Sequence, residues 1–153
     1  MKKYKIKSFH KKILSDTITP VSIYLKVRDY FPNCILLESS DYKINSNNYS
    51  YICFNPIAHI KLKNKKISYL YPDQKTSEIN ISENDKISDF IHQFTSIFQT
   101  TNYNFKFISN GLFGYIAHEA VERFESISLN KEKNDLNIPD LFYSVYQNVI
   151  AVS

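Results

Sequence analysis

Hydrophobic and polar positions follow two rhythms along this chain, one with helical spacing and one with strand spacing. The clearest helical rhythm lies within 86–98, where polar residues occupy the face opposite to an apolar stripe. That stripe consists of Ile87, Phe90, Ile91, Phe94, Ile97 and Phe98. We expect an amphipathic helix here, with its apolar face packed on a sheet.

An earlier helix is predicted from its start signals. Thr19 is a favoured N-cap residue, and Pro20 occupies the favoured first helical position. Pro32 marks the expected end of this helix, because the ring of a proline disfavours helical backbone in the residue before it. Between these bounds the apolar positions recur at helical spacing: Ile23, Val27, Tyr30 and Phe31.

Short apolar runs bounded by polar turns predict strands. These runs span 34–39, 50–55, 57–63, 66–71, 112–117 and 141–152, with a lysine-rich first strand near the N-terminus and a short helix over 118–124. Asn64 and Lys65 separate two of the runs and predict a tight hairpin, although neither residue is glycine. The elements show no βαβ rhythm, so we predict an α+β fold with an antiparallel β-sheet and flanking helices.

Composition agrees with a folded chain. Hydrophobic residues make up 43%, charged residues 22% and aromatic residues 15% of the 153 positions, which is typical of a globular protein. One domain over 1–153 is the simplest expectation. The apolar run 149–152 reaches almost to the last residue, which predicts that the chain ends before the fold is complete.

The charge distribution and the targeting signals limit the classes of partner that we expect. The net charge of +4 comes mainly from lysines spread along the chain, with only two arginines, so we expect no nucleic-acid partner. No apolar stretch at the N-terminus is long enough for a signal peptide, and no segment approaches the ~20 apolar residues of a membrane span. We therefore expect no membrane partner and a cytoplasmic location. Cys34 and Cys53 lie in apolar runs without CxxC spacing and are expected to be two buried thiols.

Catalytic and metal-binding motifs are not apparent in this sequence. The four histidines are far apart and form no metal-ligand or nucleophile–base motif, and a chain with two glycines has no phosphate-binding glycine loop. We therefore assign neither a catalytic residue nor a metal site to this chain.

Two constellations remain as candidates. In 35–41 an apolar strand ends abruptly in Glu38 and Ser39, which present a carboxylate and a hydroxyl to an ammonium group or, alternatively, cap the next turn. In 110–125 both glycines of the chain, Gly111 and Gly114, lie in or beside an expected strand, which indicates close backbone approach. For this second stretch, tight internal packing is favoured over ligand contact.

Taken together, four segments of the chain resemble the N-terminal region of anthranilate synthase component I. They are Thr19–Leu25, Leu36–Ser39, Asn55–Ala58 and Gly111–Glu125, and they occur in the family's order. The last segment is shared with the related aminodeoxychorismate synthase component I of folate synthesis. The Leu-Leu-Glu-Ser sequence at 36–39 favours the tryptophan-pathway family.

The resemblance implies a lyase of tryptophan biosynthesis that converts chorismate to anthranilate and pyruvate. The complete enzyme uses Mg²⁺ and ammonia delivered by a glutamine amidotransferase subunit, component II, and is inhibited by L-tryptophan. The same resemblance assigns Ser39 and Glu38 to the L-tryptophan site. Tyr49 and Ser50 are weaker candidates, because the strand that they open could return beside Ser39.

The family's chorismate and Mg²⁺ residues lie in a C-terminal region that has no counterpart in this sequence. The resemblance therefore implies no bound metal and no turnover by this chain alone. Two alternatives stay open at this point. Beside the favoured anthranilate synthase component I, the chain could be a free-standing, non-catalytic amino-acid-binding module, or it could be the N-terminal part of an aminodeoxychorismate synthase component I.

Overall fold

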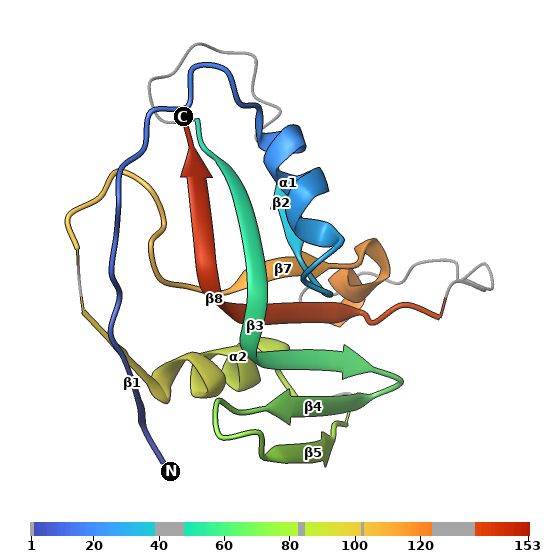
Figure 1. The fold of residues 1–153 in the computed structure, drawn as a ribbon. Helices are drawn as coiled ribbons and strands as arrows, with labels where there is room; N and C mark the ends of the chain where they lie inside the picture. Colours follow the sequence, from blue (N-terminus) through green and yellow to red (C-terminus); the bar gives the residue numbers. More distant parts are fainter. Residues whose placement is uncertain (1, 39–47, 83–84, 102, 124–136) are drawn as a thin grey trace.

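The computed structural model describes residues 2–38, 48–82, 85–101, 103–123 and 137–153 (Figure 1). Its main sheet is antiparallel, with strand order β5-β4-β3-β8-β7 and with β2 also paired to β3. The predicted α+β class, an antiparallel sheet with flanking helices, is confirmed. In chain order the elements are β1 (Tyr4–Ile6), α1 (Pro20–Arg28), β2 (Ile35–Leu37), β3 (Ser50–Lys63), β4 (Lys66–Leu70), β5 (Thr76–Asn80), α2 (Ile87–Ser96), β6 (Phe98–Thr100), β7 (Phe113–Ile116), the 3-10 helix η1 (His118–Arg123) and β8 (Leu141–Val152).

Two long strands, β3 and β8, form the centre of this sheet and bend together (Figure 1). The bend coincides with a register shift between Pro56 and Ala58 and with a positive φ of 59° at Asn55. Proline has no N–H to donate to a ladder and is tolerated at such a bulge. The prediction of separate strands over 50–55 and 57–63 was therefore wrong, because the chain bends at Pro56 without leaving the sheet.

The hairpin between β3 and β4 is confirmed. Asn64 and Lys65 have φ values of 52° and 59°, as the two central residues of a type I′ turn require. The next strand, β5, pairs antiparallel with β4 and was not predicted from the sequence. Four of its five residues are exposed, so this edge strand lacks the apolar alternation that identifies a strand.

Helix α2 and the sheet enclose the larger hydrophobic core, as the apolar stripe predicted. The predicted extent of the stripe was wrong at its end, because the helix stops at Ser96 and Phe98 lies in β6. Ile87 and Phe94 are each only 1% exposed. The Phe94 ring lies 5.7 Å from the Tyr69 ring of β4 and 5.3 Å from the Phe98 ring, centroid to centroid. Removal of these apolar groups from water is the main driving force for docking the helix. The same core also contains Ala58, Ile60, Leu62, Ile67, Ile81, Ile97, Leu141 and Val145.

Helix α1 lies along β2 and β3 (Figure 1). Its predicted start is confirmed, because the Ser22 amide donates to Thr19 Oγ1 at 3.1 Å and the Thr19 amide donates to Ser22 Oγ at 3.2 Å. Its predicted end was wrong: the helix stops at Arg28, so Tyr30 and Phe31 lie outside it. Tyr30 is 82% exposed, which shows that its apolar spacing did not mark a buried face.

The chain start and the cysteines differ in part from expectation. The lysine-rich first strand exists as β1, but it pairs in parallel with β6, outside the main sheet. Cys53 is buried, and burial raises the pKa of its thiol to about 12. Cys34 is only half-buried, so the prediction of two buried thiols holds for Cys53 alone.

Tyr69 in the larger core has a buried hydroxyl without a hydrogen-bond partner among the described residues. Replacing Tyr69 with phenylalanine keeps the ring beside Phe94 and removes this unsatisfied group. We expect the free energy of unfolding at pH 7 to rise by about 1 kcal/mol, measured by urea denaturation. A loss of stability in Tyr69→Phe would show that the hydroxyl has a partner.

The same residue predicts a dependence on alkaline pH. Burial raises the pKa of Tyr69 from 10.0 to about 12, so the folded chain retains a proton that the unfolded chain releases. Its contribution to stability is complete below pH 10 and is lost as the pH rises towards 12. The free energy of unfolding of Tyr69→Phe should therefore fall less steeply than that of the wild type between these values.

Candidate functional site

Three of the four predicted ligand residues lie at one end of the main sheet, where β2 ends and β3 begins. Leu37 pairs with Tyr51, so Glu38 and Ser50 are the next residues on the two strands at the same end of the ladder. Ser50 in turn pairs with Val152 of β8. Ser39 lies outside the described residues. Among the described residues, the structure thus brings Glu38, Tyr49 and Ser50 together at the end of the sheet formed by the end of β2 and the start of β3, called this edge below.

The side chains at this edge differ in exposure. Glu38 is exposed, whereas Tyr49 and Ser50 are half-buried. An exposed carboxylate at the end of a strand can accept hydrogen bonds from a ligand ammonium group, and the Ser50 hydroxyl can both donate and accept. The edge therefore combines a negative charge with neutral polar groups.

An aromatic cluster adjoins this edge. The Tyr49 ring lies 5.6 Å from the Phe107 ring and 6.5 Å from the Tyr51 ring, and Tyr51 lies 5.5 Å from Phe113. The Ile108 amide donates to the Tyr51 hydroxyl at 3.1 Å, which fixes the segment before β7 against β3. Such rings can contact the side chain of an aromatic ligand.

Sequence reasoning missed the contribution of the 103–107 segment to this cluster. Aromatic residues occur there at every second position, Tyr103, Phe105 and Phe107, and the last two rings stack at 4.7 Å with an interplanar angle of 12°. This alternation was the available signal. It is typical of a strand, but the described residues of the segment have no regular secondary structure and pack against other parts of the chain.

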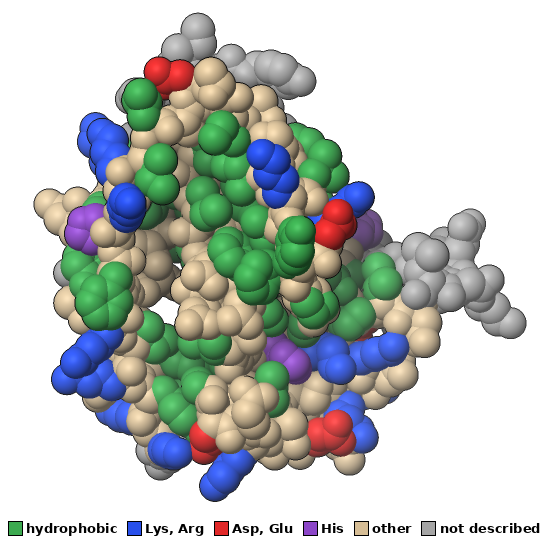
Figure 2. Space-filling model, viewed as in Figure 1, with side chains coloured by type: hydrophobic (Ala, Val, Ile, Leu, Met, Phe, Trp, Pro, Cys, Tyr) green, Lys and Arg blue, Asp and Glu red, His purple; other side chains and the backbone are tan. Residues whose placement is uncertain are grey.

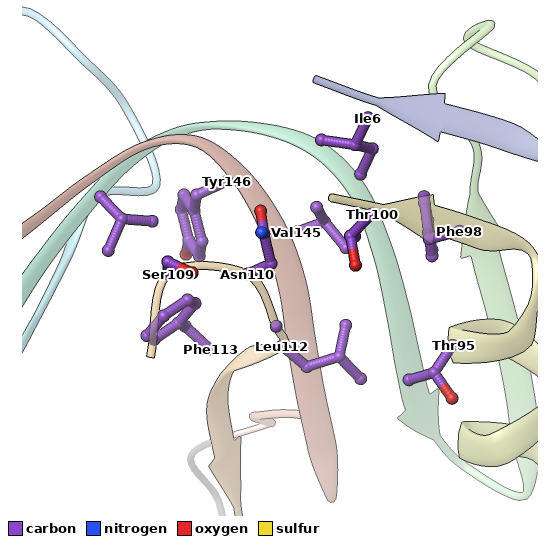
Figure 3. A pocket seen from close by; sticks show the side chains of 12 residues that line it. Ile6, Thr95, Phe98, Thr100, Ser109, Asn110, Leu112, Phe113, Val145 and Tyr146 are labelled. Carbon is purple, nitrogen blue, oxygen red and sulfur yellow. The ribbon is translucent and has the colours of Figure 1, made fainter. Parts of the chain in front are cut away.

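A separate pocket of about 220 Å³ lies between the β1–β6 pair and the β7–β8 side of the main sheet (Figure 3). In Figure 2 the surface is visibly hollowed between the N-terminal segment and β8. The pocket was not predicted, because its walls come from segments that are far apart in sequence. It is lined by Ile6, Thr95, Phe98, Thr100, Ser109, Asn110, Gly111, Leu112, Phe113, Val145, Tyr146 and Val149.

The two glycines have different roles in this region. A Cβ on Gly114 would lie 1.9 Å from the Phe142 carbonyl oxygen, so this glycine permits the close approach of β7 to β8. Packing is therefore the role of Gly114, as favoured from the sequence. Gly111 lines the pocket, and a Cβ there would lie 3.3 Å from Ile108 Cγ2.

The part of the chain that the structure describes contains no group of three or more His, Cys, Asp or Glu side chains arranged to hold a metal ion. These residues therefore offer no fit for Mg²⁺.

Among the histidines, burial followed by the charge of Lys61 lowers the pKa of His59. The His10 ring packs against Phe105 at 4.9 Å. Within the same described residues, every helix is too short or too polar to cross a membrane.

No protein-family model matches the chain. Anthranilate synthase component 1 of Lactococcus lactis is 27% identical over 141 residues, which cover 92% of this chain and 28% of that protein. Anthranilate synthase component 1 of Aquifex aeolicus is 25% identical over 150 residues, which cover 97% of this chain and 29% of that protein.

A solved structure of anthranilate synthase component I from Streptococcus pneumoniae aligns with 94% of this chain and 29% of its own length, at 18% identity and a TM-score of 0.49. The chain thus spans less than a third of the length of the curated relatives that it matches. The resemblance found in the four sequence segments is confirmed: over nearly its whole length, this chain is similar to anthranilate synthase component I.

Proposed function

We propose that the chain serves as the regulatory part of an anthranilate synthase component I and contributes its L-tryptophan feedback site. The observation that carries this proposal is the similarity of 92–97% of the chain to two proteins of that name. In the complete enzyme, chorismate and ammonia yield anthranilate and pyruvate with Mg²⁺ as cofactor. Component II, the glutamine amidotransferase subunit, supplies the ammonia.

The proposed L-tryptophan site consists of Glu38, Ser39, Tyr49 and Ser50. The exposed Glu38 carboxylate provides a partner for the ligand ammonium, and the two serine hydroxyls provide neutral hydrogen-bonding groups. Tyr49, within an aromatic cluster with Phe107 and Tyr51, provides a surface for the indole ring. The convergence of Glu38, Tyr49 and Ser50 at one sheet edge supports this assignment.

Turnover belongs, in this proposal, to the region that the relatives have beyond the matched residues. The chain alone is expected to bind the regulator without converting chorismate. An aminodeoxychorismate synthase component I is the alternative enzyme, and product analysis of the complete protein distinguishes the two. The relatives from Lactococcus lactis and Aquifex aeolicus both carry the anthranilate synthase name, which favours the tryptophan pathway.

The proposal is testable in a hybrid enzyme, in which this chain replaces the matching 141-residue region of the Lactococcus lactis protein. We expect the hybrid to form anthranilate from chorismate, ammonia and Mg²⁺, followed by anthranilate fluorescence, and to be inhibited by L-tryptophan. Introducing Ser39→Phe should raise the inhibitory concentration of L-tryptophan at least about 10-fold while turnover stays unchanged, because the larger side chain occupies ligand space.

Ser88→Phe is the matched control, since Ser88 is exposed on α2, away from the proposed site. Inhibition of this control should equal that of the unmodified hybrid. Normal inhibition of the Ser39→Phe hybrid would refute the site assignment. A correctly folded hybrid that forms no anthranilate would refute the assignment of this chain to the enzyme.

A further inference from the structure

We propose that the pocket between the β1–β6 pair and β8 is a second binding site, which takes a small, uncharged aromatic molecule. Its described lining residues include none of Glu38, Tyr49 and Ser50, which sets it apart from the proposed L-tryptophan site. The pocket adjoins the aromatic cluster of that site through Phe113, whose ring lies 5.5 Å from the Tyr51 ring. The inference does not depend on the enzyme's identity. It rests on the size, charge and hydrogen-bonding groups of the pocket.

Size limits the ligand to one or two fused rings. The cavity volume is about 220 Å³. A dry cavity of about 150 Å³ lined by leucine, isoleucine and phenylalanine is enough to hold benzene, whereas drug-sized ligands need about 300 Å³ or more. The pocket is therefore suited to a molecule slightly larger than benzene.

The shape of the pocket favours a flat ligand. Phe98 lies at one end, and Phe113 and Tyr146 lie at the other (Figure 3). Between them the aliphatic side chains of Leu112 and Val145 form part of the wall (Figure 3). Rings at both ends provide offset-stacked or edge-to-face contacts with an aromatic molecule.

The uncharged lining of the pocket disfavours amino acids and organic acids as ligands. Among the described residues, no Lys, Arg, His, Asp or Glu side chain lines the pocket. Tyr146, its only titratable lining group, remains neutral near pH 7, because burial raises its pKa to about 12. A ligand carboxylate or ammonium would leave water without an ionic partner here, which is strongly unfavourable. A neutral molecule avoids this penalty.

Two hydroxyls remain available for such a ligand. Thr95 Oγ1 donates to the His92 carbonyl at 2.9 Å, and the Asn110 amide group donates to Thr101 and accepts from Ser8. The Thr100 and Ser109 side chains make no hydrogen bond to another described residue. Each can accept from, or donate to, one N–H or O–H group on the ligand.

The N-terminal segment closes one side of the pocket through Ile6. This segment is held by the hydrogen bond from Ser8 Oγ to Asn110 Oδ1 at 2.8 Å and by that from the Tyr103 hydroxyl to the Ser8 carbonyl at 2.6 Å. A bound ligand that contacts Ile6 stabilises this closed arrangement. Amide hydrogen exchange over residues 4–8 should therefore slow when the pocket is filled.

Indole is a suitable probe, because it is neutral, bicyclic and carries one N–H donor. The chain contains no tryptophan, so the fluorescence of indole can be followed directly. We expect saturable binding to the 153-residue chain with a dissociation constant on the order of 1 mM, which is in the usual range for a ligand of this size. Methyl NMR signals of Val145 and Val149 should shift in proportion to the bound fraction.

Val149→Phe fills the pocket from β8 and should weaken indole binding at least about 10-fold. Val21→Phe is the matched control: Val21 is 44% exposed on α1, and indole affinity should stay unchanged. Ser109→Leu fills the same pocket from the 108–112 segment and serves if Val149→Phe does not fold. The proposal is overturned if indole fails to saturate, if the valine methyl signals do not move, or if a folded filling variant binds indole like the wild type.

The outcome is separable from that of the proposed function. Glu38→Gln should weaken L-tryptophan binding and leave indole binding intact, whereas Val149→Phe should have the opposite effects. Indole binding that is lost in Glu38→Gln, but retained in Val149→Phe, would place the probe in the L-tryptophan site and contradict a second site.

Discussion

Replacing Gly114 with alanine should lower the free energy of unfolding by at least about 3 kcal/mol, because the new methyl group meets backbone atoms. The added Cβ would lie 1.9 Å from the Phe142 carbonyl oxygen and 2.9 Å from Tyr143 Cα. Gly114 pairs with Tyr143 across the β7–β8 ladder, so no side-chain rotation relieves the overlap. Relief requires separation of the two strands and loss of their hydrogen bonds.

Gly111→Ala is the matched control for this prediction. Its Cβ would meet only Ile108 Cγ2, at 3.3 Å, and this side chain is flexible and 54% exposed. Neither glycine has a positive φ, so conformational strain does not distinguish the two substitutions. We expect Gly111→Ala to change stability by about 0.5 kcal/mol or less in urea denaturation followed by circular dichroism. Equal losses in the two variants would show that β7 and β8 do not approach as described.

Truncating Phe94 to alanine should cost about 3–5 kcal/mol, the usual loss for a fully buried phenylalanine. Phe94 is 1% exposed and is among the largest fully buried side chains of the described residues. Its ring contacts Tyr69 of β4, Tyr71 just after β4, and Phe98 of β6. The substitution thus opens a cavity where α2, the main sheet and the β1–β6 pair meet.

Gln93→Ala tests whether the effect arises from burial rather than from the helix itself. Gln93 precedes Phe94 on α2 and is exposed, and alanine has slightly higher helix propensity than glutamine. This control should stay within about 0.5 kcal/mol of the wild type in the same urea experiment. A Phe94→Ala loss below about 1 kcal/mol would mean that α2 contributes little to the core.

The sequence predictions that rest on neighbouring residues were the most accurate. The α2 stripe from Ile87 to Phe94, the Thr19 cap and the Asn64–Lys65 turn each depend on residues within a few positions, and the structure shows all three. The predicted continuation of the stripe to Phe98 was wrong, because Phe98 lies in β6. The end of α1 was less well predicted, because Tyr30 and Phe31 continue the apolar spacing after the helix has stopped. Spacing alone did not show that no part of α1 is fully buried.

The candidate ligand residues were found through resemblance rather than through physical pattern. Leu-Leu-Glu-Ser at 36–39 directed attention to Glu38, and the β2–β3 ladder then placed Ser50 at the same sheet end. The aromatic neighbours of Tyr49 could not be derived in the same way. Phe107 is 58 positions away in sequence, and only the fold of the segment before β7 brings the two rings to 5.6 Å.

By itself the sequence determined the α+β class, most of the strands, both helix starts and the resemblance to anthranilate synthase component I, because these depend on local spacing or on residues in order. Tertiary structure decided the continuity of β3 through Pro56, the β1–β6 pair, the edge strand β5 and the pocket against β8. Each of these depends on pairing between distant segments. Such pairing is selected by the burial of the whole core and by backbone hydrogen bonding, which no short window of sequence contains.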